Sequence, residues 1–173
     1  TLPIADVVLD GVVVGAERVL AEPGSLDPRA VPRVLEEATV ALATSVAATC
    51  REIFEWTVEY SKEREQYGRP IGSFQALKHR MADMYLAVER ASSLCWFAAL
   101  TIAEDDPRRH EAAALAKAAV GECQMLLVTD GLQMHGGIGF TWEHDLHFLL
   151  KRAKWNELAY GDPSWHRERL AAL

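Results

Sequence analysis

The chain has 173 residues, of which 50% are hydrophobic, and a formal net charge of -7 at pH 7. This length supports one compact domain with a substantial core, and the acidic balance argues against nucleic acid or an anionic membrane as the main partner. No uninterrupted apolar run reaches the roughly 18 residues that a membrane span requires, and the N-terminus has no secretory pattern. We therefore expect a soluble, cytoplasmic chain with no membrane segment.

Residues 1–26 are rich in valine, and Asp10-Gly11 lies between two apolar runs. An Asp-Gly pair in that setting predicts a two-residue β-hairpin. Such a hairpin is only marginally stable by itself. We interpret residues 1–26 as the end of a β-domain or a linker, with an N-terminal arm packed on the helices as the alternative.

From residue 27 onward the pattern is helical, with short turns. Asp27 before Pro28 is typical of an N-cap followed by proline in the first helical turn, and Ser73 can cap a second helix. The predicted helices cover residues 28–63, 74–104, 107–134, 143–159 and 164 to the end. Long helices joined by short turns predict an all-α, antiparallel up-down bundle over residues 27–173.

The cysteines and histidines do not form a recognisable metal-binding pattern. Cys50, Cys95 and Cys123 are far apart in alanine-rich or aliphatic sequence, which favours buried, reduced thiols. His144 and His147 share a helical face but have no third ligand nearby. We expect no metal site.

The stretch REQYGRPIGSFQ, from Arg64 to Gln75, forms the corner between the first two helices. It combines a guanidinium group, amides, aromatic rings and two glycines, which can meet a phosphate or a flat ring. The structural alternative is a solvated corner with Tyr67 and Phe74 packed inward.

The stretch QMHGGIGFTWEH, from Gln133 to His144, interrupts a long helical pattern. Glycine within a helix costs about 1 kcal/mol relative to alanine, so the backbone must need the space or the conformation. Paired glycines let another molecule contact the main chain, although a helix C-cap and a tight turn would also explain them. We expect Phe140 and Trp142 to point into the core.

The aromatic side chains elsewhere in the helices are expected to lie in the core or at a subunit interface, not against substrate. They are Trp96, Phe97, Trp142, Phe148 and Trp155.

Three motifs follow one another along the chain: R-x-Q-[FY]-G-x-P-I-x-x-F-Q, then Q-x-x-G-G-x-G-[FY], then KRAK. In this order they resemble the C-terminal helical domain of the acyl-CoA dehydrogenase family. The resemblance covers nearly the whole chain, because DVVLDGVVVGAERVL resembles the passage from the family's central β-domain into its helical bundle. It implies an antiparallel helical bundle preceded by a short β segment. It also implies FAD-dependent α,β-dehydrogenation of acyl-CoA thioesters.

In that family FAD lies between subunits. The resemblance implies that the first motif reaches the pyrophosphate of a neighbouring subunit's flavin, and that the second motif approaches the ADP portion of the same flavin. The matching residues are Arg64, Gln66, Tyr67, Gln75, Gln133, Gly136 and Gly137. Residues just after the fourth helix contact the flavin of their own chain, and there this sequence has Asp162 and Ser164 in place of the usual threonine and glutamine.

The catalytic base is where this sequence departs from the family. Many members carry a glutamate in a Y-E-G-T turn after the fourth helix, where this chain reads AYGD and has Tyr160. A phenol keeps its proton at neutral pH and is a poor base. Other members carry the glutamate on the first helix, where an ungapped count reaches Ala38. Glu37 fits only with a shift of one residue, about 100° around the helix, and Asp162 is the other nearby carboxylate.

The alternative for Glu36 and Glu37 is a solvated acidic first turn favoured by the helix dipole.

Membership of the family's heteromeric group would explain the absent glutamate, because in that group one subunit carries the base and another completes the flavin site. The stretches GFTWEHDLHFLLKRAK and YGDPSWHRERL resemble bacterial members of that group, which act on bulky acyl-CoA thioesters such as steroid side chains. We predict an FAD-binding, oligomer-forming C-terminal domain of such a subunit, inactive alone. Its partners would be acyl-CoA, an identical or different acyl-CoA dehydrogenase subunit, and an electron acceptor such as an electron-transfer flavoprotein.

Two alternatives remain. One is a self-sufficient acyl-CoA dehydrogenase that uses Glu37 or Asp162 as its base. The other is a non-catalytic helical assembly module that binds no flavin.

Overall fold

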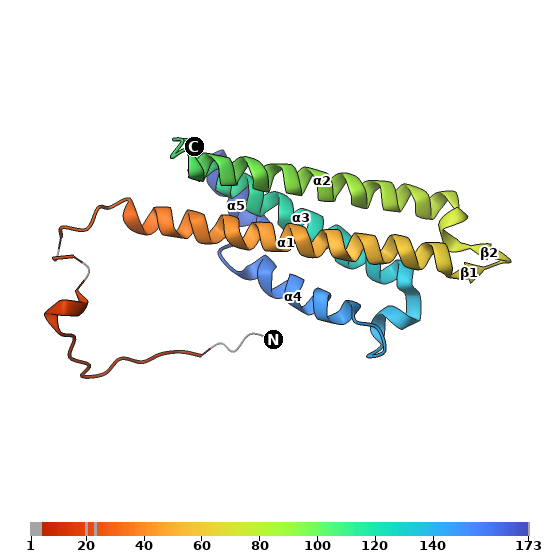
Figure 1. Cartoon of the computed structure of the whole chain (residues 1–173), viewed down its shortest axis with the longest axis horizontal. Coiled ribbons are helices and arrows are strands. Elements are labelled where there is room, and N and C mark those ends of the chain that lie inside the picture. Colours follow the sequence, from red (N-terminus) through yellow and green to blue (C-terminus); the bar gives the residue numbers. More distant parts are fainter. Residues whose placement is uncertain (1–4, 20, 23, 173) are drawn as a thin grey trace.

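The computed structural model describes residues 5–19, 21–22 and 24–172. Figure 1 shows three long helices, α1, α2 and α3, lying side by side and antiparallel, with α4 beside them and the short α5 against α3. The expected antiparallel helical bundle is confirmed. The elements in chain order are η1 (Ala16–Arg18), α1 (Ala30–Glu63), β1 (Glu65–Gln66), β2 (Arg69–Pro70), η2 (Ile71–Ser73), α2 (Gln75–Ala103), α3 (Arg109–His135), η3 (Gly136–Phe140), α4 (Leu146–Leu158) and α5 (Pro163–Ala171).

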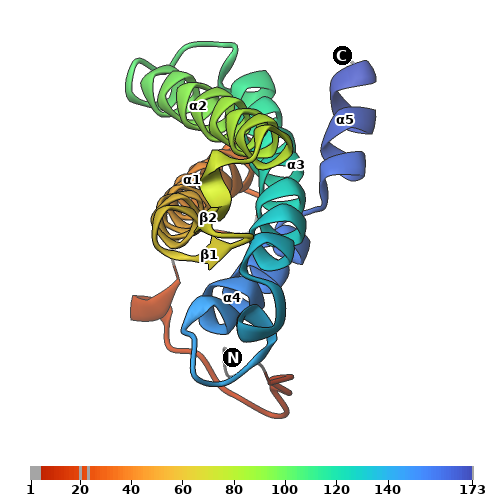
Figure 2. The ribbon, with the colours of Figure 1, turned by 90° about the vertical axis from the view of Figure 1, so that its right-hand side faces the viewer.

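Small side chains let α3 serve as the central helix of the bundle. Its neighbours are α1 and α2 on one side and α5 on the other, as the end view in Figure 2 shows. Alanines at the contact surface allow close approach of helix backbones, while larger residues at spacings of three and four fill the remaining space. The core contributed by α3 comprises Ala112, Ala113, Ala116, Val120, Cys123, Leu127 and Met134.

The three cysteines are buried and free, as expected. A hydrogen bond with Cys123, together with burial, raises the pKa of the Cys50 thiol. Burial raises the pKa of Cys95 to about 11. The Cys50 and Cys95 thiols therefore stay protonated at neutral pH, and all three cysteines act as small apolar core side chains.

Two helical stretches, Gln75–Ala103 and Arg109–Phe140, are long and apolar enough to cross a membrane by length and composition alone. In the second, 67% of the most apolar window is buried inside the bundle, against 28% in the first. Burial in the core therefore accounts for the apolar length of α3. On α2, the corresponding apolar surface includes the exposed Leu86, Trp96 and Leu100.

The helix starts differ from the sequence-based expectations. Asp27 does not cap α1; it accepts a hydrogen bond from the backbone N–H of Arg29 at 2.9 Å and so closes the turn before the helix. Ser73 lies within η2, and the N-cap of α2 is Phe74, which makes no side-chain capping bond. At the other end of the bundle, α4 begins at Leu146, because residues 141–145 form turns.

The predicted hairpin at Asp10-Gly11 is wrong for the described residues. Residues 5–19 contain only the short η1 and no strand, and Figure 1 shows this segment running away from the helices. Val8 is 86% exposed and Val13 is 93% exposed. A two-stranded hairpin needs a third strand or a packed face to be stable, and neither is present among the described residues.

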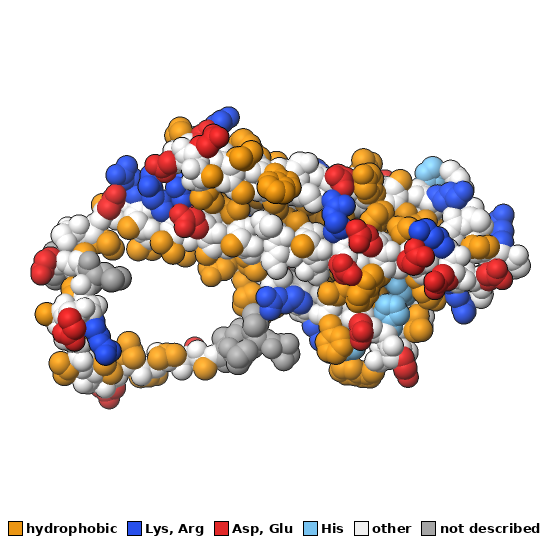
Figure 3. Space-filling model, viewed as in Figure 1, with side chains coloured by type: hydrophobic (Ala, Val, Ile, Leu, Met, Phe, Trp, Pro, Cys, Tyr) orange, Lys and Arg blue, Asp and Glu red, His pale blue; other side chains and the backbone are white. Residues whose placement is uncertain are grey.

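The expectation that Phe140 and Trp142 point into the core is also wrong. Both are largely exposed, as are Trp96 on α2 and Phe148 on α4. Figure 3 shows hydrophobic side chains exposed over α1, α2 and α4. Exposed aromatic rings of this size are typical of surfaces that contact another protein or domain. Of the two positions expected for them, core or subunit interface, this exposure suits the interface.

Gly121 allows α5 to contact α3. A Cβ atom there would collide with Pro163 Cγ, at the start of α5. We predict that Gly121→Ala lowers the free energy of unfolding by about 1–2 kcal/mol, since overpacking exceeds the gain in helix propensity. Urea unfolding measures this. Gly137→Ala is the matched control, because a Cβ at Gly137 meets nothing within 4 Å; equal effects of the two variants would contradict the packing explanation.

Candidate functional site

A tight hairpin follows the end of α1 and carries the first motif. Its strands pair Glu65 with Pro70 and Gln66 with Arg69. Tyr67 and Gly68 at the tip have φ values of 54° and 76°, as a type I′ turn requires. Tyr67 does not pack inward as the structural alternative supposed: it is 93% exposed.

The backbone of Ile71 returns to the end of α1, where its N–H donates to the Arg64 carbonyl at 2.8 Å. Ile71 is buried, so it anchors the hairpin to the bundle. The side chain of Arg64, at the start of the hairpin, and that of Gln66, on its first strand, remain exposed.

The glycines after α3 have different structural reasons. Gly136 ends the helix with φ 62° and ψ -142°, a conformation that other residues rarely adopt. Gly139 is restricted by packing, because a Cβ there would lie 3.0 Å from Leu132 Cδ1 and 3.1 Å from His135 Cβ. For Gly137 neither reason applies: its φ is not in the left-handed region and a Cβ would meet open space. The chain's own packing therefore does not require glycine at 137.

The two motifs meet in one cleft of about 490 Å³ between the ends of α1 and α3. Five of the predicted cofactor-binding residues line it, namely Arg64, Gln66, Gln133, Gly136 and Gly137. The other two predicted residues of the first motif do not: Tyr67 projects from the hairpin tip, and Gln75 is exposed at the start of α2, where its amide lies 3.2 Å from His79 Nε2. The second motif therefore meets the first motif at Arg64, Gln66 and Ile71.

Three polar residues of the cleft were not predicted from the sequence: Tyr60, Arg80 and His135. Tyr60 lies one helical turn before Arg64, and His135 directly precedes Gly136, so their spacing from the motifs could have indicated them. Arg80 lies on α2 and pairs with Asp130 on α3, a contact between helices that only the fold reveals.

The floor of the cleft is held by a stacked pair of rings. Tyr60 and His135 lie with centroids 4.6 Å apart, and the Tyr60 hydroxyl donates to the His135 carbonyl at 3.3 Å. His135 Nδ1 donates to the Gly131 carbonyl at 2.7 Å. Burial lowers the pKa of His135, so the ring is neutral at pH 7. These contacts tie the last turn of α3, and so Gly136, to α1.

The electrostatics of the cleft suit an anion. Arg64 takes part in none of the ion pairs found among the described residues. Its guanidinium is therefore free to make bidentate hydrogen bonds to a phosphate. The amides of Gln66 and Gln133 add neutral donors and acceptors beside it.

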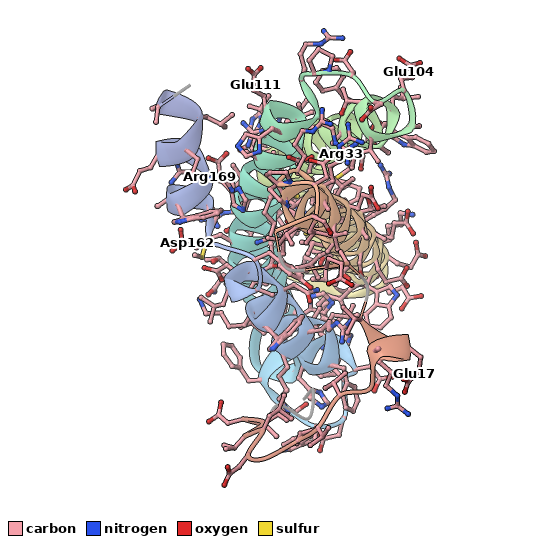
Figure 4. All side chains as sticks on the ribbon, turned by 90° about the vertical axis from the view of Figure 1, so that its left-hand side faces the viewer. Glu17, Arg33, Glu104, Glu111, Asp162 and Arg169 are labelled. Atoms are coloured by element: carbon pink, nitrogen blue, oxygen red, sulfur yellow. The ribbon has the colours of Figure 1, made fainter. Side chains whose placement is uncertain are left out.

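The turn between α4 and α5 lies elsewhere. Figure 4 shows Asp162 where α4 and α5 meet beside α3. Pro163 contacts Gly121, which lies fifteen residues before Gly136, about 22 Å along the helix axis. Asp162 and Ser164 therefore do not line the cleft.

The turn residues have structural partners. The Asp162 carboxylate caps α5 by accepting from the Trp165 backbone N–H at 2.8 Å. Ser164 Oγ accepts from Arg167 at 3.1 Å. Tyr160 has φ 59° and is 47% exposed.

The carboxylates on the first helix are engaged by Arg109. Glu36 Oε2 lies 2.7 Å from Arg109 Nε, and its Oε1 lies 3.1 Å from His110 Nδ1. Glu37 Oε1 lies 3.3 Å from Arg109 Nη2. The expected solvated acidic turn is wrong for Glu36, whose side chain is 12% exposed, because Arg109 holds it against α3.

The described residues contain no group of three or more His, Cys, Asp or Glu side chains placed to hold a metal ion. His144 Nδ1 instead accepts from the Leu146 backbone N–H at 3.1 Å, at the start of α4.

The comparisons with known proteins agree with the fold. Residues 29–172 match the family described as acyl-CoA dehydrogenase, C-terminal domain. The acyl-CoA dehydrogenase IpdE2 of Mycobacterium tuberculosis (strain ATCC 25618 / H37Rv) is 41% identical over 122 residues, which is 70% of this chain and 36% of IpdE2. The Tcur3481-Tcur3483 steroid ACAD has a TM-score of 0.80 at 34% identity, over 86% of this chain and 41% of that one.

The ChsE4-ChsE5 complex of Mycobacterium tuberculosis contains a chain with a TM-score of 0.77 at 29% identity, covering 80% of this chain and 38% of that one. This chain thus spans well under half the length of the relatives that it matches. From its bundle, its motifs and the family match over residues 29–172, the chain belongs to the acyl-CoA dehydrogenase family, as its C-terminal helical domain.

Proposed function

We propose that this chain is the FAD-binding and oligomer-forming C-terminal domain of an acyl-CoA dehydrogenase subunit that lacks the usual catalytic glutamate. The observation that carries the FAD assignment is Gly137, whose backbone and surroundings would accept a side chain. A glycine without an internal reason is explained by a ligand that contacts the main chain. Arg64 and the amides of Gln66 and Gln133 line the same cleft, and this set of donors fits a pyrophosphate and its nucleoside.

Bound FAD supplies the acceptor for the hydride that leaves the β-carbon of an acyl-CoA thioester. This chain's residues bind and orient it: Arg64 neutralises phosphate charge, and Gly136 and Gly137 admit the dinucleotide to the backbone. The stacked Tyr60 and His135 rings, which line the same cleft, would form part of the surface that receives it. At the second site, Asp162 and Ser164 face the flavin of the same chain.

The α-proton needs a base that this chain does not clearly provide. Tyr160 stands at the usual position, Asp162 caps a helix, and Glu37 is paired with Arg109. A carboxylate held in an ion pair or a cap is less available as a base, which supports the view that another subunit supplies it. We therefore propose that the isolated chain does not turn over acyl-CoA.

The similarity to the steroid ACAD and to a chain of the ChsE4-ChsE5 complex supports a bulky acyl-CoA substrate and a subunit partner. The proposal includes a cytoplasmic location, which three reduced cysteines favour, and an electron-transfer flavoprotein as electron acceptor. The exposed aromatic side chains of α2 and α4 are available for the subunit interface. They equally suit the alternative of an assembly module without flavin, which the FAD content of the protein distinguishes.

The first test measures FAD content by absorbance in the full-length protein, purified alone and after co-expression with a neighbouring dehydrogenase homologue. Flavin that is present only with the partner supports a shared site with the base on the other subunit. Full occupancy in the protein alone favours the self-sufficient enzyme, and Glu37→Gln or Asp162→Asn then abolishes turnover. No flavin in either preparation overturns the proposal.

Arg64→Ala is predicted to weaken FAD binding by about tenfold or more, because a hydrogen bond to a charged group contributes roughly 1.5–3 kcal/mol. Titration of the full-length apoprotein with FAD measures the Kd. Arg69→Ala is the matched control: Arg69 lies on the same hairpin, stacks on Phe74 at 4.2 Å and does not line the cleft. Equal Kd values for Arg64→Ala and the unaltered protein would place the phosphate elsewhere.

A further inference from the structure

Lys117 is the largest fully buried side chain of the described residues, at 1% exposure in the middle of α3. Its neighbours on the helix are alanines, and Ala116 and Ala118 are buried as well. Removing an ammonium group from water is unfavourable unless it is well compensated. Desolvation accordingly lowers the pKa of Lys117. A lysine at such a position needs a specific reason.

The ammonium group is bound by carbonyl oxygens. Lys117 Nζ donates to the Gly161 carbonyl at 2.7 Å and to the Glu157 carbonyl at 3.1 Å. It makes no ion pair within 4.0 Å of its nitrogen among the residues that the structure describes. Glu157 lies in the last turn of α4, where carbonyls lack intrahelical partners and attract a cation. Lys117 therefore caps α4 from the neighbouring helix and simultaneously holds the turn beyond it.

That turn has an unusual backbone. Tyr160 and Gly161 have φ values of 59° and 94° in succession, and a tyrosine in the left-handed region persists only where its surroundings enforce it. His166 Nε2 lies 2.9 Å from the Tyr160 carbonyl, and Asp162 receives the Trp165 N–H. Three contacts thus fix three successive residues, and the Lys117 contact is the one that comes from outside the α4–α5 segment.

The consequence concerns the side chains that the turn presents. Tyr160 is 47% exposed and Asp162 is exposed, so solvent reaches both side chains. We propose that Lys117 is a positioning residue, whose buried ammonium group sets the Tyr160–Asp162 turn and thereby the placement of that turn against FAD and acyl-CoA. The role of the turn in this inference rests on the proposed function. The contacts that hold the turn do not depend on it.

The experiment compares Lys117→Met with Gln124→Met in the full-length protein, with its partner subunit if flavin requires it. Gln124 is a matched control: it is 2% exposed, lies on the same helix and gives the same product residue. Hydrogen exchange is followed at the backbone amides of Ala159, Trp165 and His166, which bond within and around the turn. The visible absorption and circular dichroism of bound FAD are recorded in parallel.

We expect Lys117→Met to speed exchange of the turn amides by about tenfold or more while amides of α2 keep their rates. We also expect a changed flavin spectrum and a fall in kcat larger than the rise in KM. Gln124→Met should change none of these. Turn exchange equal to that of Gln124→Met, or a uniform acceleration that includes α2, overturns the positioning role. If Lys117→Met does not fold, Lys117→Gln, which keeps a shorter N–H donor, provides the same comparison.

The two proposals fail separately. If the unaltered protein binds no FAD in any preparation, the proposed function fails, while the exchange rates still decide whether Lys117 fixes the turn. If FAD binds and Lys117→Met frees the turn without altering the flavin spectrum or the kinetic constants, Lys117 is structural only and the further inference fails.

Discussion

Arg109→Met is expected to lower the free energy of unfolding by about 3 kcal/mol, because it removes the main partner of a buried carboxylate. The Arg109 side chain is 10% exposed and that of Glu36 is 12% exposed, with 2.7 Å between Nε and Oε2. The two residues lie 73 positions apart, on α3 and α1. Breaking the pair leaves Glu36 with only His110 at 3.1 Å. Urea unfolding at pH 7 measures the loss.

Arg108→Met is the matched control, since Arg108 pairs with Asp106 on the surface, with 62% of its side chain exposed. Exposed pairs contribute little, so this variant should unfold nearly as the unaltered protein does. The double variant Arg109→Met with Glu36→Gln should recover part of the loss, because it removes the unpaired charge as well. Equal stabilities of Arg108→Met and Arg109→Met would contradict the buried-pair explanation.

The second large effect is on the pH dependence of stability. Burial, above all, lowers the pKa of His166 from 6.5 to about 4. Between these values the unfolded state binds a proton that the folded state excludes, so stability falls as pH falls below 6.5 and the loss is complete near pH 4. The full difference corresponds to about 3 kcal/mol, and about 2 kcal/mol is reached by pH 5.

His166 is surrounded by charges of both signs. Lys117 on α3 and Arg169 on α5 oppose its protonation, while Asp162 favours it. Figure 4 shows Arg169 extending from α5 toward α3, where its Nη2 lies 2.8 Å from His110 Nε2.

Urea unfolding of the unaltered protein and of His166→Gln at pH 8, 7, 6 and 5 isolates the histidine. Carboxylates titrate in both proteins and cancel in the difference. The unaltered protein should lose stability relative to His166→Gln as the pH falls from 7 to 5. Parallel curves would show that His166 does not titrate differently in the folded and unfolded states.

Periodicity and turn residues predict the bundle because each long helix must bury one apolar stripe, and Gly, Pro and Asp mark its ends. The order of α1 to α5 follows from these local signals. The Asp10-Gly11 pair predicts a hairpin that residues 5–19 do not form, because a two-stranded hairpin is stable only where further strands or a packed face support it. The Asp-Gly turn is a local signal in the sequence, whereas the strands or packed face that would stabilise a hairpin lie elsewhere in a fold.

The site was predictable where a motif is contiguous. Arg64, Gln66 and the Gly136-Gly137 pair could be assigned from the resemblance, and the fold brings them into one cleft. The contacts of Lys117 with Glu157 and of Arg109 with Glu36 could not be predicted, since they join residues 40 and 73 positions apart. A lysine within an alanine-rich helix resembles a solvated residue until the neighbouring helices are placed around it.

The central helix carries both ends of the proposed cofactor arrangement. Gly121, beside the turn proposed to face the flavin of its own chain, and Gly136, at the cleft proposed for a neighbour's flavin, belong to one continuous helix and its cap. In the proposed oligomer, the separation of two cofactors is therefore fixed by the number of residues in α3. Inserting a single residue between them would lengthen the helix by about 1.5 Å and turn one site by about 100° relative to the other. A change in the length of a loop elsewhere would not have this effect. The number of residues between Gly121 and Gly136 is therefore the length to which the proposed assembly is most sensitive.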